Sequence, residues 1–202
     1  MVIHAARLIA IAGHSGNVQP VISGLGSEHQ GAKLAAIEAA SRLKILTPDR
    51  LYALLTDPDA MIRVATLDVL VRQQPQTDTR PPDRIVSTVV SLLDDPECAE
   101  AAAAAIGELG PASTAVVDTL KSMALHHDDP LCREAAVASL GSLGRGQSAV
   151  IESLNDIAAI RRRATVALSN FDGPDVDLAL ARAAQDRDAQ VRQLAEDLLG
   201  GA

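Results

Sequence analysis

The sequence has almost no aromatic residues. It contains one tyrosine, Tyr52, one phenylalanine, Phe171, and no tryptophan, although 48% of its residues are hydrophobic. The core must therefore be built from alanine, valine, leucine and isoleucine, whose small side chains allow helices to pack closely. The same shortage argues against a site that stacks a large flat ligand between aromatic rings.

Cysteine and long apolar runs are also scarce. Cys98 and Cys132 are too few for a disulfide framework, and their use as ordinary residues suggests a reducing cytoplasm. Residues 2–12 are mostly apolar, but the run is too short to span a membrane and lacks the charged start of a secretory signal. We therefore expect a cytoplasmic protein whose chain begins with an ordinary helix.

Positive charge is in deficit. The chain has 18 lysine and arginine residues against 26 aspartate and glutamate residues, a net charge of -8. Proteins that bind nucleic acid rely on clustered lysine and arginine. A nucleic-acid partner is therefore not expected.

What the sequence does contain is a repeated motif. Asp57-Pro58-Asp59 precedes a segment with one apolar helical stripe, and variants of it begin at Asp95, Asp129 and Arg187. Pro58 and Pro96 are 38 residues apart, and Pro96 and Pro130 are 34 apart. A period of this size is typical of stacked repeat proteins.

The repeats predict an all-α fold, a right-handed α-solenoid of about five to six helical hairpins. Thr47 is expected to cap a second helix that begins at Pro48. We expect a single array whose repeats cover residues 1–26, 27–56, 57–93, 94–126, 127–155 and 156–185, with a terminal half-repeat at 186–202.

The pattern of Asp-Pro-Asp, an apolar residue, Arg and then Ala-x-x-x-Leu-Gly resembles the HEAT repeat, in the short bacterial form also found in phycobilisome-lyase-type proteins. The resemblance covers residues 27–200. It implies two antiparallel helices per repeat, with the second helices on a concave face. The aspartate and arginine of the family are carried here by Asp57 and Arg63, and by Asp186 and Arg192.

Both Arg63 and Arg192 are expected to be structural, since each can bond its own turn or a neighbouring carboxylate. Arg133 and Arg161 match the same position in two other repeats. Ala99 occupies it in the third repeat and interrupts any ladder of such pairs.

Four residues are candidate metal ligands: Cys98, Cys132, His126 and His127. Thiolates and imidazoles bind zinc, and the two cysteines stand at the same place in consecutive repeats. However, cysteine also behaves as a small buried apolar residue, and no Cys-x-x-Cys pair is present. We favour this second interpretation and expect neither a metal nor a cofactor.

The basic run Arg161-Arg162-Arg163, with Arg145, is able to bind a phosphate or an acidic peptide. Three successive helical residues point in different directions, so we favour a solvated face with one structural arginine. The acidic run from Asp94 to Glu97 is explained by a helix start, where carboxylates cap free amides.

No catalytic constellation is evident, because none of the five histidines lies in a recognisable hydrolase or zinc-protease motif. The leading hypothesis is a non-catalytic scaffold or adaptor that binds a protein or peptide. The alternatives are a bilin lyase or chaperone, which the resemblance implies, and a HEAT-like DNA-binding or repair protein.

The predicted docking surface is the polar side of the second helices, which helical spacing places opposite their buried stripe. Its residues are Arg50, Tyr52, Arg84, Ser87, Thr88, Asp118, Lys121, Glu152 and Arg182. Arginine and tyrosine are enriched among binding anchors. The alternative surface is the proline-rich loop at 74–82.

Overall fold

The computed structural model describes residues 2–73, 81–110 and 113–200, and every regular element within these ranges is a helix. The predicted all-α solenoid is confirmed. None of the described helices is long and apolar enough to cross a membrane. The proline-rich loop, our alternative docking surface, lies outside the described residues over positions 74–80.

The chain divides into two compact units, Met1–Ala105 and Ile106–Ala202. The division falls within α7 (Ala99–Leu109), and the repeat pattern gives no sign of it. We describe each unit by itself.

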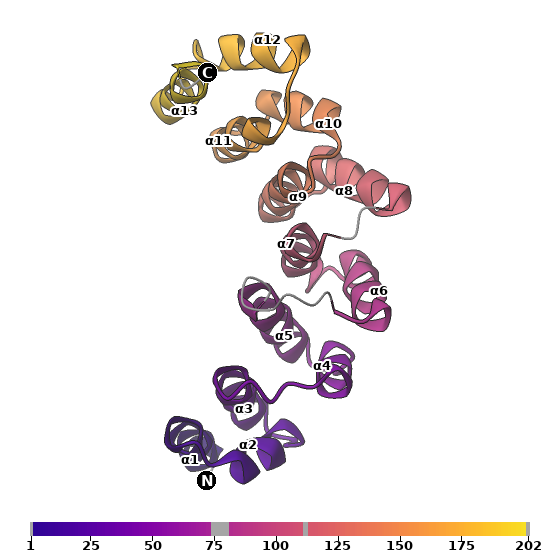
Figure 1. The fold of residues 1–202 in the computed structure, drawn as a ribbon, viewed down its shortest axis with the longest axis vertical. Helices are drawn as coiled ribbons and strands as arrows, with labels where there is room; N and C mark the ends of the chain where they lie inside the picture. The colour runs from indigo at the N-terminus through magenta and orange to yellow at the C-terminus, as the bar shows by residue number, and fades with distance from the viewer. Residues whose placement is uncertain (1, 74–80, 111–112, 201–202) are drawn as a thin grey trace. The chain divides into compact units, whose positions relative to one another are not determined.

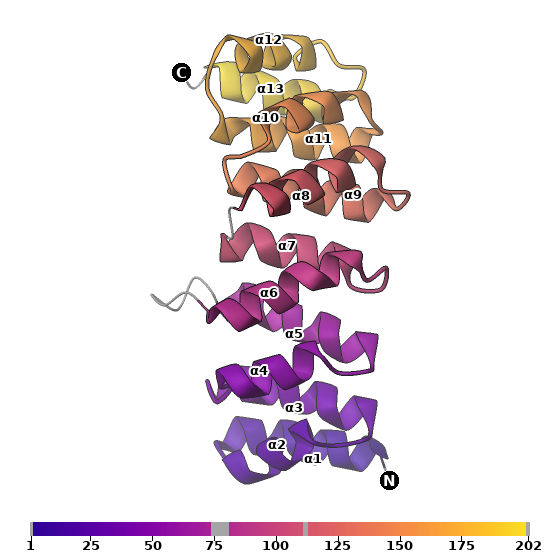
Figure 2. The same ribbon diagram turned by 90° about the vertical axis from the view of Figure 1, so that its right-hand side faces the viewer.

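In the first unit, helices alternate between two sides (Figures 1 and 2). The first helices of the hairpins are α1 (Val2–Ser15), α3 (Gln30–Arg42) and α5 (Ala60–Gln73), and α3 packs against both of the others. The second helices are α2 (Val18–Leu25), α4 (Pro48–Leu55) and α6 (Asp83–Ser91), followed by a 3-10 turn at Leu92–Asp94. We call the exposed side of the second helices the second-helix face.

The second unit has the same arrangement. Its second helices are α8 (Thr114–His126), α10 (Gln147–Glu152) and α12 (Pro174–Ala183), and its first helices are α9 (Pro130–Ser142), α11 (Ala158–Ala167) and α13 (Ala189–Gly200). Short 3-10 turns at Ser153–Asn155 and Leu168–Asn170 extend α10 and α11. Helix α11 packs against α9 on one side and α13 on the other.

The core is aliphatic, as the composition predicts. Ile37, Leu54, Ile62 and Val69 form one buried cluster between successive hairpins of the first unit. Ala183, Val191 and Ala195 form another at the end of the second unit. Each hairpin thus buries its apolar stripe against its neighbours, which is the principle of a repeat array.

Sequence signals fix several helix ends. The Thr47 hydroxyl accepts a hydrogen bond from the amide of Arg50, and Pro48 takes the first helical position, so the predicted start of α4 is confirmed. Asp129 caps α9 in the same way, through the amide of Leu131. These caps satisfy amides that have no partner inside the helix.

Candidate functional site

A ladder of ion pairs joins neighbouring repeats on the side of the interhelical turns. In the first unit, Lys33 pairs with Asp57 at 2.7 Å and Arg63 with Asp95 at 2.7 Å. In the second unit the rungs are Arg133 with Asp156 at 2.8 Å and Arg161 with Asp186 at 2.8 Å. As expected from the sequence, Ala99 offers no donor at the corresponding place in α7.

Each arginine of the ladder also holds its own turn. Arg63 donates to the carbonyl of Asp57 at 2.8 Å, and Arg192 donates to that of Asp186 at 2.8 Å. The expectation that both are structural agrees with these bonds. Arg63 thus bonds both its own turn and Asp95 of the next repeat, whereas the bonds of Arg192 are to carbonyls of its own turn.

The carboxylates of the ladder are stabilised in their charged form. The hydrogen bonds from Arg133 lower the pKa of the Asp156 carboxyl, and those from Arg161 lower the pKa of Asp186. An opposite charge and a donated hydrogen bond both favour the ionised acid. The ladder is therefore ionic at neutral pH.

The basic run in α11 is also consumed by pairing. Arg161 is only 4% exposed and donates to both carboxylate oxygens of Asp186 through Nε and Nη2. Arg162 pairs with Asp188, and Arg163 pairs with Glu134. The expectation of one structural arginine on a solvated face was too narrow, since all three arginines are paired. Arg161 and Arg162 reach carboxylates of the turn before α13, and Arg163 reaches Glu134 of α9. A free phosphate-binding cluster is not formed.

Both cysteines occupy an apolar position of the repeat. Each lies in the first turn of a first helix or directly before that helix. The equivalent position holds Ile62 in α5, Ile160 in α11 and Val191 in α13, and all three are buried. Cys98 and Cys132 are buried there, and burial raises the pKa of the Cys98 thiol. Within the described ranges no group of three or more histidine, cysteine, aspartate or glutamate residues is arranged to hold a metal ion.

On the second-helix face of the first unit, Arg84 of α6 stacks on Tyr52 of α4, 3.5 Å from the ring centroid. Arg84 also lies 3.8 Å from Asp49. A planar guanidinium gains from stacking on an aromatic ring. The two strongest anchors predicted in this unit are therefore brought together.

The other predicted residues of the first unit are partly used within the fold. Arg50 donates to the carbonyl of Ile45 at 2.6 Å, so its charge serves the turn before α4. The hydroxyls of Ser87 and Thr88 both donate to the carbonyl of Arg84. These contacts within one helix or turn were not visible in the helical spacing.

In the second unit, Lys121 and Asp118 form an exposed pair on α8, at 3.1 Å. Glu152 of α10 and Arg182 of α12 line a groove of about 310 Å³ between their helices. Its remaining lining residues are Ser148, Ile151, Leu154, Asn155, Ala183 and Asp186. The fold therefore joins two predicted residues in one site and leaves the α8 pair outside it.

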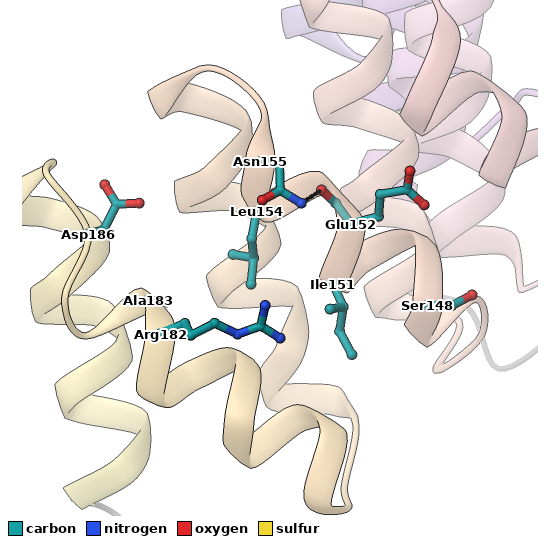
Figure 3. A pocket seen from close by; sticks show the side chains of 8 residues that line it. All are labelled: Ser148, Ile151, Glu152, Leu154, Asn155, Arg182, Ala183 and Asp186. Atoms are coloured by element: carbon teal, nitrogen blue, oxygen red, sulfur yellow. Dashed lines mark hydrogen bonds between the residues drawn. The ribbon is translucent and has the colours of Figure 1, made fainter.

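Figure 3 shows how the side chains lie in this groove. The guanidinium of Arg182 points toward Ile151 and Leu154, while the carboxylates of Glu152 and Asp186 point away from it. Asp186 is already bonded by Arg161. We find no ion pair of Arg182 among the described residues.

Sequence reasoning missed the apolar half of this groove. Ile151 and Leu154 match the apolar stripe of a second helix, which predicts that they are spent on the core. In the structure both are only half-buried, whereas Val150 beside them is fully buried. Helix α10 ends at Glu152 and Leu154 lies in a 3-10 turn, so the regular helical stripe does not continue to Leu154.

Taken together, these features define an all-α repeat solenoid in which side-chain ion pairs join neighbouring repeats and a groove lies between two of the second helices. A model of HEAT repeats matches residues 47–141 and 86–159, which together span more than half of the chain. The protein therefore belongs to the HEAT-repeat family. No curated protein sequence matches it significantly.

Solved structures share the fold at low sequence identity. YibA of Escherichia coli is 14% identical, with 94% of this chain and 72% of that chain covered and a TM-score of 0.68. A designed armadillo repeat protein in complex with the peptide (KR)4 is 16% identical, with 89% and 97% covered and a TM-score of 0.62. At such identities the likeness concerns the fold.

Proposed function

We propose that this protein is a non-catalytic scaffold that binds an extended peptide segment of a partner protein on its second-helix face. The observation that carries the proposal is the groove between α10 and α12, which combines apolar side chains with a charged side chain that has no ion-pair partner among the described residues. Protein-binding sites use this combination of apolar anchors and oriented charges.

The grooves on the first-helix side are less suited to a ligand. One of about 280 Å³ is lined by Glu134, Arg162 and Arg163 together with apolar residues, and all three charged residues belong to ion pairs. Another, of about 450 Å³, is lined by Arg72, Glu38 and Asp68, of which the first two pair with each other. These pairs are largely exposed and weak, but they already neutralise the charges that would orient a partner, whereas Arg182 has no ion-pair partner among the described residues.

The likeness in fold to a peptide-binding repeat protein also supports this function. A designed armadillo repeat protein of this fold has been solved with a peptide bound, and an extended face is what stacked repeats offer a partner. That peptide is basic, whereas the charge facing the groove of this protein is positive. We therefore take from the comparison only the mode of binding and not the kind of peptide.

The alternative functions are less well supported by the site. A bilin requires a large pocket with flat contacts, but the groove of about 310 Å³ has no aromatic lining residue. DNA requires a basic surface, but the second-helix face mixes acidic and basic residues and the net charge is -8. Of the described histidines, none lines the groove, so an acid–base role there has no candidate.

The test is selection of binding peptides from a display library of random dodecapeptides, followed by affinity measurement with variants. Tyr52→Ala with Arg84→Glu alters the second-helix face of the first unit, and Glu152→Lys with Arg182→Glu alters that of the second. We expect at least one pair to weaken the selected peptides about tenfold or more, as loss of a binding anchor does.

Two exposed arginines away from the second-helix face supply the controls. Arg7→Glu on α1 and Arg187→Glu in the turn before α13 change the charge without touching that face. Thermal unfolding confirms that each variant is folded. Peptides that bind all second-helix variants as tightly as the unaltered protein would overturn the proposal.

A further inference from the structure

We propose that the groove between α10 and α12 selects a peptide segment in which an acidic side chain stands beside an aliphatic one. This inference rests on the proposed function and adds the chemistry of the partner to it. It is carried by the position of Arg182 relative to Ile151 and Leu154 (Figure 3).

The charge argument begins with how the second unit uses its arginines. Arg133, Arg161, Arg162 and Arg163 each pair with a carboxylate of a neighbouring element. Arg182 is exposed, lines a groove, and takes part in no ion pair among the residues described. A guanidinium in this position binds a carboxylate through two parallel hydrogen bonds, the strongest neutral-pH contact open to it.

The neighbouring carboxylates do not reverse this preference. Asp186 is held by two bonds from Arg161, each 2.8 Å long, and the carboxylate of Glu152 points away from the groove. The positive charge of Arg182, whose guanidinium points toward the apolar side chains of the groove, repels a basic ligand there. An acidic ligand would meet a cation that no side chain of the groove already neutralises.

The apolar argument comes from the same wall. Ile151, Leu154 and Ala183 line the groove, and the first two are half-buried. The guanidinium of Arg182 points toward both. A ligand that pairs with Arg182 therefore places its adjacent side chain against aliphatic carbon, and burial of an apolar side chain there is favourable.

The dimensions restrict the ligand further. A volume of about 310 Å³ is at the lower end of ligand pockets, which range over roughly 300–1,000 Å³. It accommodates one or two side chains of a longer segment and leaves the rest of the segment to lie along the face. The selective element is thus a pair of neighbouring side chains in an extended chain.

The experiment uses three fluorescein-labelled dodecapeptides measured by fluorescence anisotropy at low ionic strength. The first alternates leucine with glutamate, the second leucine with lysine, and the third serine with glutamate. We expect the first to bind about tenfold or more tightly than either of the others, because only it satisfies both the cation and the apolar wall.

Variants of the protein locate the effect. Arg182→Glu should weaken the leucine–glutamate peptide about tenfold or more, and Arg182→Lys should weaken it less, since lysine keeps the charge without the paired geometry. Arg187→Glu makes the same change of net charge outside the groove and should leave the affinity unaltered. Ile151→Ser, at a half-buried position, should weaken binding with Arg182 intact.

The outcomes separate this inference from the proposed function. Tighter binding of the leucine–lysine peptide, or equal effects of Arg182→Glu and Arg187→Glu, would overturn the acidic preference. If the peptides selected by display still lost affinity with second-helix variants, the scaffold function would stand without it. Circular dichroism and the thermal midpoint of each variant establish that a lost affinity is not a lost fold.

Discussion

Among single residues, the arginines show how the same side chain serves different ends in this protein. Arg161 is almost fully buried and holds two repeats together, Arg163 makes an exposed pair, and Arg182 faces a groove. Their differences in burial predict different contributions to stability. An exposed pair gains little because water screens it, while a buried charge whose partner is removed is costly.

Replacement of Arg161 by methionine should therefore destabilise the protein strongly. It removes two bonds to Asp186 and one to the carbonyl of Asp156, each 2.8 Å long, and we expect the free energy of unfolding to fall by about 3 kcal/mol. Arg163→Met is the matched control. Its pair has side chains 45% and 30% exposed, so a loss of about 0–1 kcal/mol is expected.

Urea denaturation of the two variants measures this difference. Equal losses would mean that the ladder contributes no more than an ordinary surface pair. A loss of stability in Arg161→Met alone would establish that the Arg161–Asp186 pair holds α11 to the turn before α13.

Between elements, the distance of closest approach is set by small residues on the first helices. A Cβ atom added to Gly141 of α9 would lie 2.7 Å from the Cβ atom of Ala167 in α11. In the other unit, one added to Gly13 of α1 would lie 2.6 Å from that of Ala39 in α3. Carbon atoms that are not bonded do not approach so closely. These helices can therefore pack at this distance only because glycine has no side chain.

Gly141→Ala should accordingly destabilise the second unit, although alanine is the better helix former. Overpacking at such a contact costs roughly 1–3 kcal/mol. Gly31→Ala is the control, because Gly31 lies in the first turn of α3 and an added Cβ would meet nothing within 4 Å. It should be neutral or stabilise by up to about 1 kcal/mol.

Thermal unfolding of both glycine variants is the measurement. If Gly141→Ala unfolded at the same temperature as Gly31→Ala, the close approach of α9 to α11 would not be a constraint on the fold.

For the whole molecule, the ladder of ion pairs makes the folded state less stable as the pH falls into the acidic range. The carboxyls of Asp156 and Asp186 have pKa values below the ordinary value of 3.8 because arginines donate hydrogen bonds to them. A group whose pKa is lower in the folded state stabilises the fold above its unfolded pKa. That contribution is lost as the pH falls toward the folded value.

The thermal midpoint should therefore be nearly constant from about pH 7 to pH 5 and fall below about pH 4. Asp186→Asn should lower the midpoint at neutral pH but reduce the additional loss in acid, so that the two curves converge. Asp172→Asn, at an exposed site in the turn before α12, should leave the profile unchanged. Parallel curves for Asp186→Asn and the unaltered protein would contradict a role of this pair in acid unfolding.

Much of the fold was determined by the sequence itself. The spacing of the Asp-Pro motifs, the apolar stripes and the cap at Thr47 are local signals, and the helices begin and end close to where these signals predict. The position of Arg63 in its repeat likewise predicted a structural role. Such features depend on residues within one or two turns of each other, so a single chain reveals them.

The tertiary structure alone decided which charged residues remain available to a partner. Arg50 and Arg182 are alike in sequence terms, yet one is bonded to the carbonyl of Ile45 and the other faces a groove. The groove itself joins α10 and α12, which the chain separates by a whole first helix. Ion pairs and grooves between repeats depend on distances between residues that are far apart in the sequence. Helical periodicity carries no information about these distances.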